Sequence, residues 1–234
     1  MKCKHLWLLA LAGVLGACAA DGGSRGSGIS ASLQGNIAAV QSAAVLRVPA
    51  TPPASGLTSL LARFAAGSPA IAVNPLEGIH VIVEETGTSA DTDISGHFAL
   101  TGSFRGRLTV LFELPVSAAS ARITVNLPAG GALTLNDVRL DTESGHANAD
   151  TQDIYCEGVV ADTDCTGMTL TMMSIESPGA YSLDSYVIRL DSSTLLDASG
   201  HALSCTELRH GDELTVDGVV NADGTFGHAI VRLH

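Results

Sequence analysis

The chain contains almost no lysine or tryptophan and few aromatic residues. Of its 234 residues, lysine occurs only at Lys2 and Lys4, tryptophan only at Trp7, and aromatic residues make up 4%. Phosphate-binding loops and Schiff-base enzymes depend on a lysine, so both chemistries are excluded from the rest of the chain. Acidic residues outnumber basic ones by 24 to 12, for a net charge of −12. This balance argues against nucleic acid as a partner, because phosphate binding needs clustered Lys and Arg.

No apolar run reaches the length of about 20 residues that a membrane-spanning helix requires. The longest run, 6–16, follows two lysines and ends in Leu15-Gly16-Ala17-Cys18. A charged start, a short apolar core and small residues at the end are typical of a secretory signal peptide. The ending resembles the bacterial lipobox. This resemblance implies that residues 1–17 are removed and that Cys18 becomes the lipid-modified first residue of the mature protein.

The same resemblance predicts where the protein resides. Ala19, and not Asp, follows the cysteine, which points to the outer membrane. We therefore expect an extracytoplasmic lipoprotein, periplasmic or surface-facing, that is held in the membrane through acyl chains on Cys18. Residues 18–32 are rich in Gly, Ser and Ala, and this composition predicts a flexible tether between the anchor and the folded part.

Short stretches of alternating polarity, separated by turn residues, occupy the chain from Ile79 onward. They predict an all-β fold in which each strand buries one face. In the first stretch Ile79, Val81 and Val83 share the inward face. The predicted strands that follow are 97–102, 107–114, 122–127, 132–140, 154–161, 168–176, 181–190, 212–220 and 225–233.

Two segments depart from the strand pattern. Residues near 57–66 carry an apolar stripe at helical spacing and predict one short helix that packs against the sheet. Residues 141–153 are polar and acidic and predict a linker. The linker divides the chain into a first folded unit at 33–140 and a second one at 154–234.

The first unit contains three motifs, Pro75-Leu76-Glu77-Gly78-Ile79-His80-Val81, Thr92-Asp93-Ile94-Ser95-Gly96-His97-Phe98-Ala99-Leu100 and Gly106-Arg107-Leu108-Thr109-Val110. Together they resemble the carboxypeptidase regulatory-like, or prealbumin-like, β-sandwich, an accessory domain without catalytic residues. The resemblance implies a hairpin turn in which Asp93 folds the backbone and Gly96 takes the left-handed conformation. It also implies a first strand near 30–37, separated from Pro75 by a long insertion.

The second unit contains the motifs Glu157-Gly158-Val159-Val160-Ala161, Ser193-Thr194-Leu195-Leu196, Gly211-Asp212-Glu213-Leu214-Thr215-Val216-Asp217-Gly218 and Asp223-Gly224-Thr225-Phe226. They resemble a bacterial extracytoplasmic OB-like domain of unassigned function. Five strands over about eighty residues suit such a barrel. We expect Leu214 and Val216 to face inward, and Gly218 to relieve crowding where the barrel bends.

Three cysteines remain in the exported part once Cys18 is lipidated: Cys156, Cys165 and Cys205. Disulfides form and persist in the oxidising compartment to which the signal peptide leads. A Cys165–Cys205 bridge closes a loop of about forty residues and is the preferred pairing, because closure of such a loop contributes several kcal/mol. Cys156–Cys165 is the alternative. The absence of a Cys-x-x-Cys motif disfavours a zinc site.

Two motifs resemble catalytic or metal sites. Asp91-x-Asp93-x-Ser95-Gly96 begins like a calcium loop, but position 12 is Gly102 in place of the closing Glu, so we interpret it as a turn. Gly22-x-Ser24-x-Gly26 matches a nucleophile elbow, yet it lies in the predicted tether and not between a strand and a helix. The histidines are scattered and lack metal-ligand spacing.

We therefore expect a non-catalytic envelope protein without a cofactor, which acts as a binding or structural module for an envelope protein or polysaccharide. An OB-like barrel suggests sugar or oligonucleotide binding by analogy, but Tyr155, Tyr181 and Tyr186 are the only candidates for exposed stacking rings. Two alternatives stay open. One is a hydrolase whose active groups meet only in three dimensions, and the other is a weak divalent-cation binder that uses the acidic turns.

Overall fold

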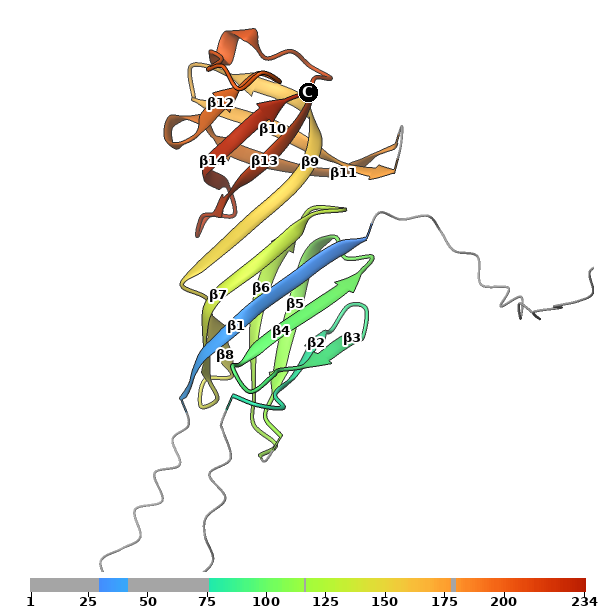
Figure 1. Ribbon diagram of the computed structural model, residues 1–234, viewed down its shortest axis with the longest axis vertical. Helices are drawn as coiled ribbons and strands as arrows, with labels where there is room; N and C mark the ends of the chain where they lie inside the picture. Colours follow the sequence, from blue (N-terminus) through green and yellow to red (C-terminus); the bar gives the residue numbers. More distant parts are fainter. Residues whose placement is uncertain (1–29, 42–75, 116, 178–179) are drawn as a thin grey trace, which may run out of the picture.

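The computed structural model describes residues 30–41, 76–115, 117–177 and 180–234. The all-β prediction is confirmed, because all strands join one continuous mixed sheet and the only helices in these ranges are two single turns of 3₁₀-helix. The sheet forms two halves that follow one another along the long axis of the molecule (Figure 1). The predicted signal peptide, Cys18, most of the predicted tether and the predicted helix near 57–66 lie outside the described residues.

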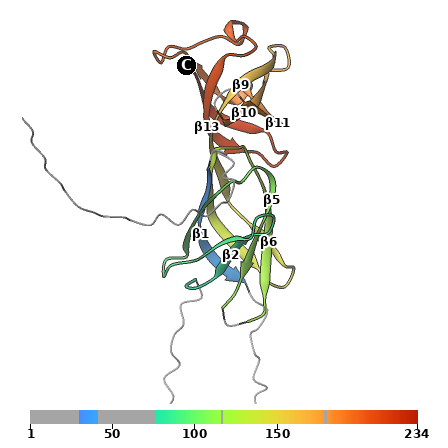
Figure 2. The same ribbon diagram turned by 90° about the vertical axis from the view of Figure 1, so that its right-hand side faces the viewer.

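The first half is a β-sandwich. One layer consists of β4 (His97–Gly102), β1 (Ala31–Gln41), β7 (Ala132–Asp141) and β9 (Thr151–Asp164). The other layer consists of β3 (Thr88–Asp91), β2 (His80–Val83), β5 (Gly106–Glu113) and β6 (Ser120–Leu127). The short β8 (His146–Asn148) pairs with both β7 and β6 and joins the layers. Figure 2 shows β1 on one side of the sandwich and β5 and β6 on the other.

Apolar side chains from alternate strand positions fill the space between the layers. Ile79, Val81 and Val83 are fully buried, which confirms their predicted shared face. Phe98 of β4 and Phe112 of β5 meet edge to face across the sandwich, with ring centroids 5.7 Å apart. Burial of a side chain of this size contributes about 1.5–3 kcal/mol, so these contacts hold the two layers together.

Strand β1 lies in the middle of its layer although a long insertion separates it from β2. It pairs antiparallel with β4 and parallel with β7, as a first strand near 30–37 requires. A Cβ atom at Gly35 would lie only 2.6 Å from the Leu135 carbonyl oxygen and 2.8 Å from the Phe98 ring. Glycine is needed there because the neighbouring strands approach too closely for a side chain.

The second half is a barrel of five strands. Their order is β9, β10 (Thr169–Ser177), β11 (Ala180–Arg189), β14 (Phe226–Leu233) and β13 (Glu213–Val220), and β13 pairs again with β9. Neighbouring strands are antiparallel except β11 and β14, which are parallel. This is an OB-like Greek-key barrel. Between β11 and β13 the chain forms η1 (Leu190–Ser192), β12 (Thr194–Leu196), which pairs with β14, and η2 (Cys205–Glu207).

The barrel interior confirms the orientation predicted for β13. Leu214 and Val216 are buried, at 1% and 0% exposure. A Cβ atom at Gly218 would lie 2.6 Å from the Cβ atom of Ala229, so the predicted crowding is present. The alternate residues of β13 therefore face the barrel interior, and β13 packs closely against β14 at Gly218.

Strand β9 belongs to both halves. Its residues from Thr151 to Tyr155 pair with β7 of the sandwich, and its residues from Asp153 onward pair with β13 of the barrel. Asp153, Ile154 and Tyr155 are paired on both sides, so the strand passes from one half into the other without a break (Figure 1).

The sequence predicts a linker at 141–153, whereas the structure places the end of β7, all of β8 and the start of β9 there. The polar composition of this segment has another cause. Its polar side chains form hydrogen bonds on the solvent face, where Arg139 pairs with Asp150 at 2.9 Å and Asn136 donates to Asp153 at 2.8 Å. Low hydrophobicity thus reflects two exposed strand faces and not a flexible connection.

Candidate functional site

A groove lies where the sandwich meets the barrel, between β6 on one side and the start of β9 on the other. It consists of two adjoining hollows of about 540 Å³ and about 500 Å³, both of which are lined by Thr124 and Gln152. The first hollow is bounded on the barrel side by Val220 and the turn at 221–224. The second extends along the sandwich to β8. We call the two hollows together the β6–β9 groove.

Strand β6 presents an unpaired edge to this groove. On one side β6 pairs with β5 along its whole length, from Ser120↔Glu113 to Leu127↔Gly106. On the other side β8 pairs with it only at Arg122↔His146. In the described part of the chain no further strand pairs with β6, so the edge is open from Thr124 to its end.

Two hydrogen bonds show which residues of β6 direct their backbone N–H and C=O groups toward the groove. The Thr109 carbonyl accepts the Glu84 N–H at 3.0 Å, so Thr109 directs its backbone groups toward β2 and away from its β6 partner, Thr124. The Arg122 N–H donates toward β8, on the opposite edge from β5. Because strand residues alternate with a period of two, the N–H and C=O groups of Thr124 and Asn126 point into the groove.

The charged side chains on the sandwich wall of the groove include two arginines. Arg107 lines the first hollow and forms no ion pair with another described residue. Arg122 lines the second, and its Nε lies 3.0 Å from the Glu84 carboxylate. In a chain of net charge −12, the unpaired guanidinium group of Arg107 gives this wall a local positive charge.

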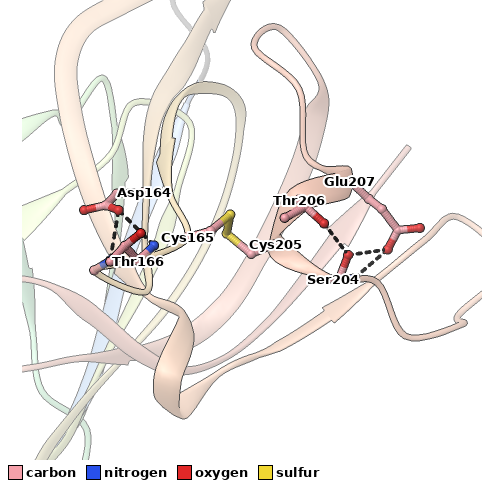
Figure 3. The surroundings of a disulfide bond; sticks show 8 residues. Asp164, Cys165, Thr166, Ser204, Cys205, Thr206 and Glu207 are labelled. Carbon is pink, nitrogen blue, oxygen red and sulfur yellow. Dashed lines mark hydrogen bonds between the residues drawn. A yellow bond between two sulfur atoms is a disulfide. The ribbon is translucent and has the colours of Figure 1, made fainter.

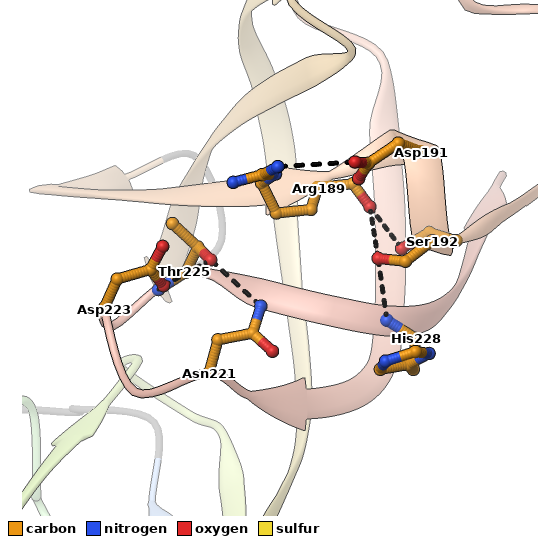
Figure 4. Close-up of polar contacts among 8 residues, drawn as sticks. Arg189, Asp191, Ser192, Asn221, Asp223, Thr225 and His228 are labelled. Atoms are coloured by element: carbon orange, nitrogen blue, oxygen red, sulfur yellow. Dashed lines mark hydrogen bonds and ion pairs between the residues drawn. The ribbon is translucent and has the colours of Figure 1, made fainter.

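The barrel wall of the groove is a rigid turn between β13 and β14. The Asn221 N–H donates to the Thr225 carbonyl at 2.8 Å, and the Asn221 amide donates to the Thr225 hydroxyl at 3.0 Å (Figure 4). The hydroxyl and the N–H of Thr225 donate to Asp223 at 2.7 and 3.0 Å, and they hold the pKa of this carboxyl below its ordinary value. The turn therefore keeps its shape without a ligand.

The remaining lining combines amide and hydroxyl groups with small apolar side chains, and the one ring among the lining residues is the imidazole of His146. Such a surface offers hydrogen bonds to a ligand but little stacking area. No sequence motif marks it, because its residues are ordinary strand residues. Along β6 the polar residues Arg122, Thr124 and Asn126 alternate with buried apolar residues, so the sequence indicates only that these three side chains face solvent.

The predicted calcium-like motif is a hairpin turn. The Asp93 carboxylate accepts the His97 N–H at 2.9 Å and the Ser95 N–H at 2.8 Å, and these bonds lower the pKa of the Asp93 carboxyl. Gly96 has a φ of +80°, as the turn interpretation requires. Asp91 contacts His80 at 2.7 Å and so does not turn toward Asp93 as a second ligand. Within the described ranges, no three His, Cys, Asp or Glu side chains gather to hold a metal ion.

Two histidine–aspartate pairs are present, His80 with Asp91 at 2.7 Å and His201 with Asp197 at 3.3 Å. No hydrogen bond joins either histidine ring to a serine hydroxyl among the residues that the structure describes. Both pairs lie in exposed turns or edges, where they stabilise local backbone structure. Ser24, from the nucleophile-elbow match, lies outside the described residues.

Cys165 and Cys205 form the preferred disulfide, with their Cα atoms 5.6 Å apart (Figure 3). The bridge ties the turn after β9 to η2, which precedes β13. Ser204 donates its N–H and its hydroxyl to the Glu207 carboxylate and fixes the η2 side of the bridge. The alternative pairing through Cys156 is therefore absent, and the long loop between β11 and β13 is held against the barrel.

Cys156, the third exported cysteine, is free and fully buried. Burial, with a contribution from the Glu157 carboxylate, raises the pKa of its thiol to about 12. Reactive thiols have a lowered pKa, so Cys156 serves packing and not chemistry.

The three tyrosines have different environments. Tyr155 and Tyr181 are each 46% exposed, on β9 and β11. Tyr186 is buried, and its ring stacks on Phe226 inside the barrel with a centroid distance of 5.5 Å. Its hydroxyl and that of Ser174 have no hydrogen-bond partner among the described residues. The two exposed rings lie outside the groove.

The chain matches no protein-family model, no curated protein and no solved structure. Within the described ranges, no helix combines the length and the apolar character needed to cross a membrane. The function is therefore argued from the β6–β9 groove and from the sequence features around it.

Replacing Cys165 and Cys205 together with serine removes the bridge and leaves no unpaired partner. The bridge spans a sequence separation of 40 residues. In the chain-entropy model a loop of this size contributes about 4 kcal/mol, so we expect a clearly lower urea midpoint for the double variant. Dithiothreitol should lower the midpoint of the wild-type chain to the same value and leave the double variant unchanged. A wild-type midpoint that resists complete reduction would contradict a stabilising role for this bridge.

Proposed function

We propose that this chain is a lipid-anchored, extracytoplasmic binding module that holds a partner from the cell envelope in the β6–β9 groove and performs no catalysis. The groove is the observation that carries the proposal. It combines a strand edge that no described strand covers, an arginine without an ion-pair partner among the described residues, and a preformed turn on facing walls. These are groups that bind and orient a ligand.

The location rests on the sequence of the amino-terminal segment. Residues 1–17 have the features of a signal peptide, and the lipobox-like ending makes Cys18 the attachment point for lipid. The Cys165–Cys205 bridge supports this location, since disulfides persist in oxidising compartments. Membership of the prealbumin-like and OB-like families remains part of the proposal, and both resemblances agree with an accessory binding role.

The shared strand suits the groove to binding. Because β9 is hydrogen-bonded on both sides at Asp153, Ile154 and Tyr155, the barrel turn is held at a fixed position relative to the sandwich. Binding between two walls that are already in place avoids the entropy cost of ordering them.

The anchor is tested by Cys18→Ser. A chain that lacks the lipidated cysteine should leave the membrane fraction and appear in the soluble extracytoplasmic fraction, because its mature part then carries no acyl chain. Immunoblots of cell fractions measure this, with Cys156→Ser as a control that should stay with the membrane. Membrane retention of a Cys18→Ser chain that has lost its apolar leader would refute the anchor, whereas a chain with an uncut leader is held by that leader.

The binding site is tested by photo-crosslinking in living cells that produce the protein. A photoreactive p-benzoylphenylalanine at Gln152, inside the groove, should give a defined adduct whose mass identifies a protein or a glycan. As the control, p-benzoylphenylalanine is placed at Ser89 on β3, which is the edge of the β3-β2-β5-β6 layer opposite to β6. This variant should give no adduct. Equal labelling from both positions, or none from Gln152, would refute the groove as the binding site.

A further inference from the structure

The free edge of β6 specifies what kind of partner fits the groove. We propose that the β6–β9 groove binds an extended, acidic segment of another protein, which adds to β6 as an extra strand. This inference rests on the proposed function, because it assigns a ligand class to the same groove.

The place beside the outer edge of β6 is only partly filled. Strand β8 has three residues and pairs with β6 at Arg122 alone, so no described strand pairs with the stretch 124–127 on this side. Four strand residues span about 13 Å. The added segment, which we call the guest strand, lies there in line with β8 and forms ladder hydrogen bonds with the backbone groups of Thr124 and Asn126.

The hydrogen-bonding groups of the groove match a peptide backbone. Backbone N–H and C=O groups that recur every second residue match the backbone of another extended peptide, which is how added strands gain affinity. A sugar chain has no such repeat and gains much of its affinity by stacking on aromatic rings. No Phe, Tyr or Trp ring lines either hollow, and the single imidazole of His146 offers little stacking area, so the lining favours a peptide over a polysaccharide.

The barrel wall of the groove stands opposite the free edge of β6. An open edge normally invites edge-to-edge aggregation unless it is covered. Here Gln152 and the turn at 221–224 stand opposite the edge of β6. These groups flank the free edge, so an added strand would contact both the edge of β6 and the opposite wall.

The charge of Arg107 favours a guest strand with acidic side chains. Arg107 has no acidic partner among the described residues, and the ionised Asp223 carboxylate across the groove accepts the N–H and hydroxyl of Thr225 at one oxygen, Oδ1. An acidic side chain on the guest would therefore pair with Arg107. The net charge of the chain is −12, but at physiological salt its repulsion is screened beyond about 8 Å, so the charges that line the first hollow, Arg107 and Asp223, decide, and an acidic side chain is attracted where it lies against Arg107.

The test uses an array of random octapeptides probed with the full chain carrying Cys18→Ser, followed by fluorescence anisotropy on the peptides that bind. We expect the binders to be enriched in Asp and Glu and to compete with one another. The same peptides with every backbone nitrogen methylated should lose at least about tenfold in affinity, because they cannot donate ladder hydrogen bonds. This comparison needs no change in the protein.

Two variants locate the peptide in the groove. Asn126→Pro removes an N–H that points into the groove, at an edge position where proline is tolerated, and should weaken binding by at least about tenfold. Arg107→Ala should lower the affinity for acidic peptides by about fivefold and should change the affinity for neutral peptides little. Ser89→Pro removes an outward N–H at the opposite edge of the layer and is the matched control, with unchanged affinity.

Three results would overturn the inference: no octapeptide binds, binding survives backbone methylation, or the groove binds an anionic oligosaccharide such as oligogalacturonate instead. A concentration-dependent dimer that Asn126→Pro abolishes would assign the edge to a second copy of this chain and would overturn it as well. In each case the photo-crosslinking at Gln152 decides separately whether the groove binds a partner, so failure of the peptide inference is distinguishable from failure of the proposed function.

Discussion

Strand β9 is the element on which the arrangement of the molecule depends. One uninterrupted strand of 14 residues completes a sandwich layer through β7 and a barrel wall through β10 and β13. The buried apolar side chains of the two halves form one continuous core, and the backbone hydrogen bonds of β9 fix the relative position of the halves. A Cβ atom at Gly158 of β9 would overlap the backbone of Met173, so the strand is also tightly packed where it enters the barrel.

This constraint produces the groove. If the two halves were joined by a flexible linker, the turn at 221–224 would have no defined distance from β6. With β9 shared, the turn stands opposite the edge that β8 leaves open after Arg122. The disulfide fixes the long loop between β11 and β13 at Cys205, away from the groove, so the wall at 221–224 depends on β9, β13 and its own hydrogen bonds.

Much of the fold can be predicted from the alternation of polar and apolar residues along the strands. The strand predicted at 97–102 has the observed bounds of β4, and the inward positions Leu214 and Val216 are buried because period-two patterning determines which face meets the core. Strands β3, β8 and β12 were not predicted, since segments as short as His146–Asn148 carry too few apolar residues to show a period. The preferred Cys165–Cys205 pairing follows from loop length, although sequence left Cys156 as an alternative.

The groove could not be predicted in the same way. Whether the edge of β6 is open depends on which strands lie beside it in space, and the pattern of Thr124 and Asn126 is the same in a central strand as in an edge strand. The predicted linker illustrates the same limit: polar residues at 141–153 are compatible with a loop or with exposed strand faces, and only the pairing of β7, β8 and β9 decides between them.

Hydrogen exchange measured by NMR on the two neighbouring amides of Val125 and Asn126 tests the open edge most directly. Val125 belongs to the ladder with Leu108 of β5, so its amide should exchange only when the sandwich opens. The Asn126 amide points into the groove and should exchange faster, on the order of a hundredfold or more, and should slow when a guest strand binds. Equal protection of both amides in the free protein would show that the edge is already covered and would contradict this account.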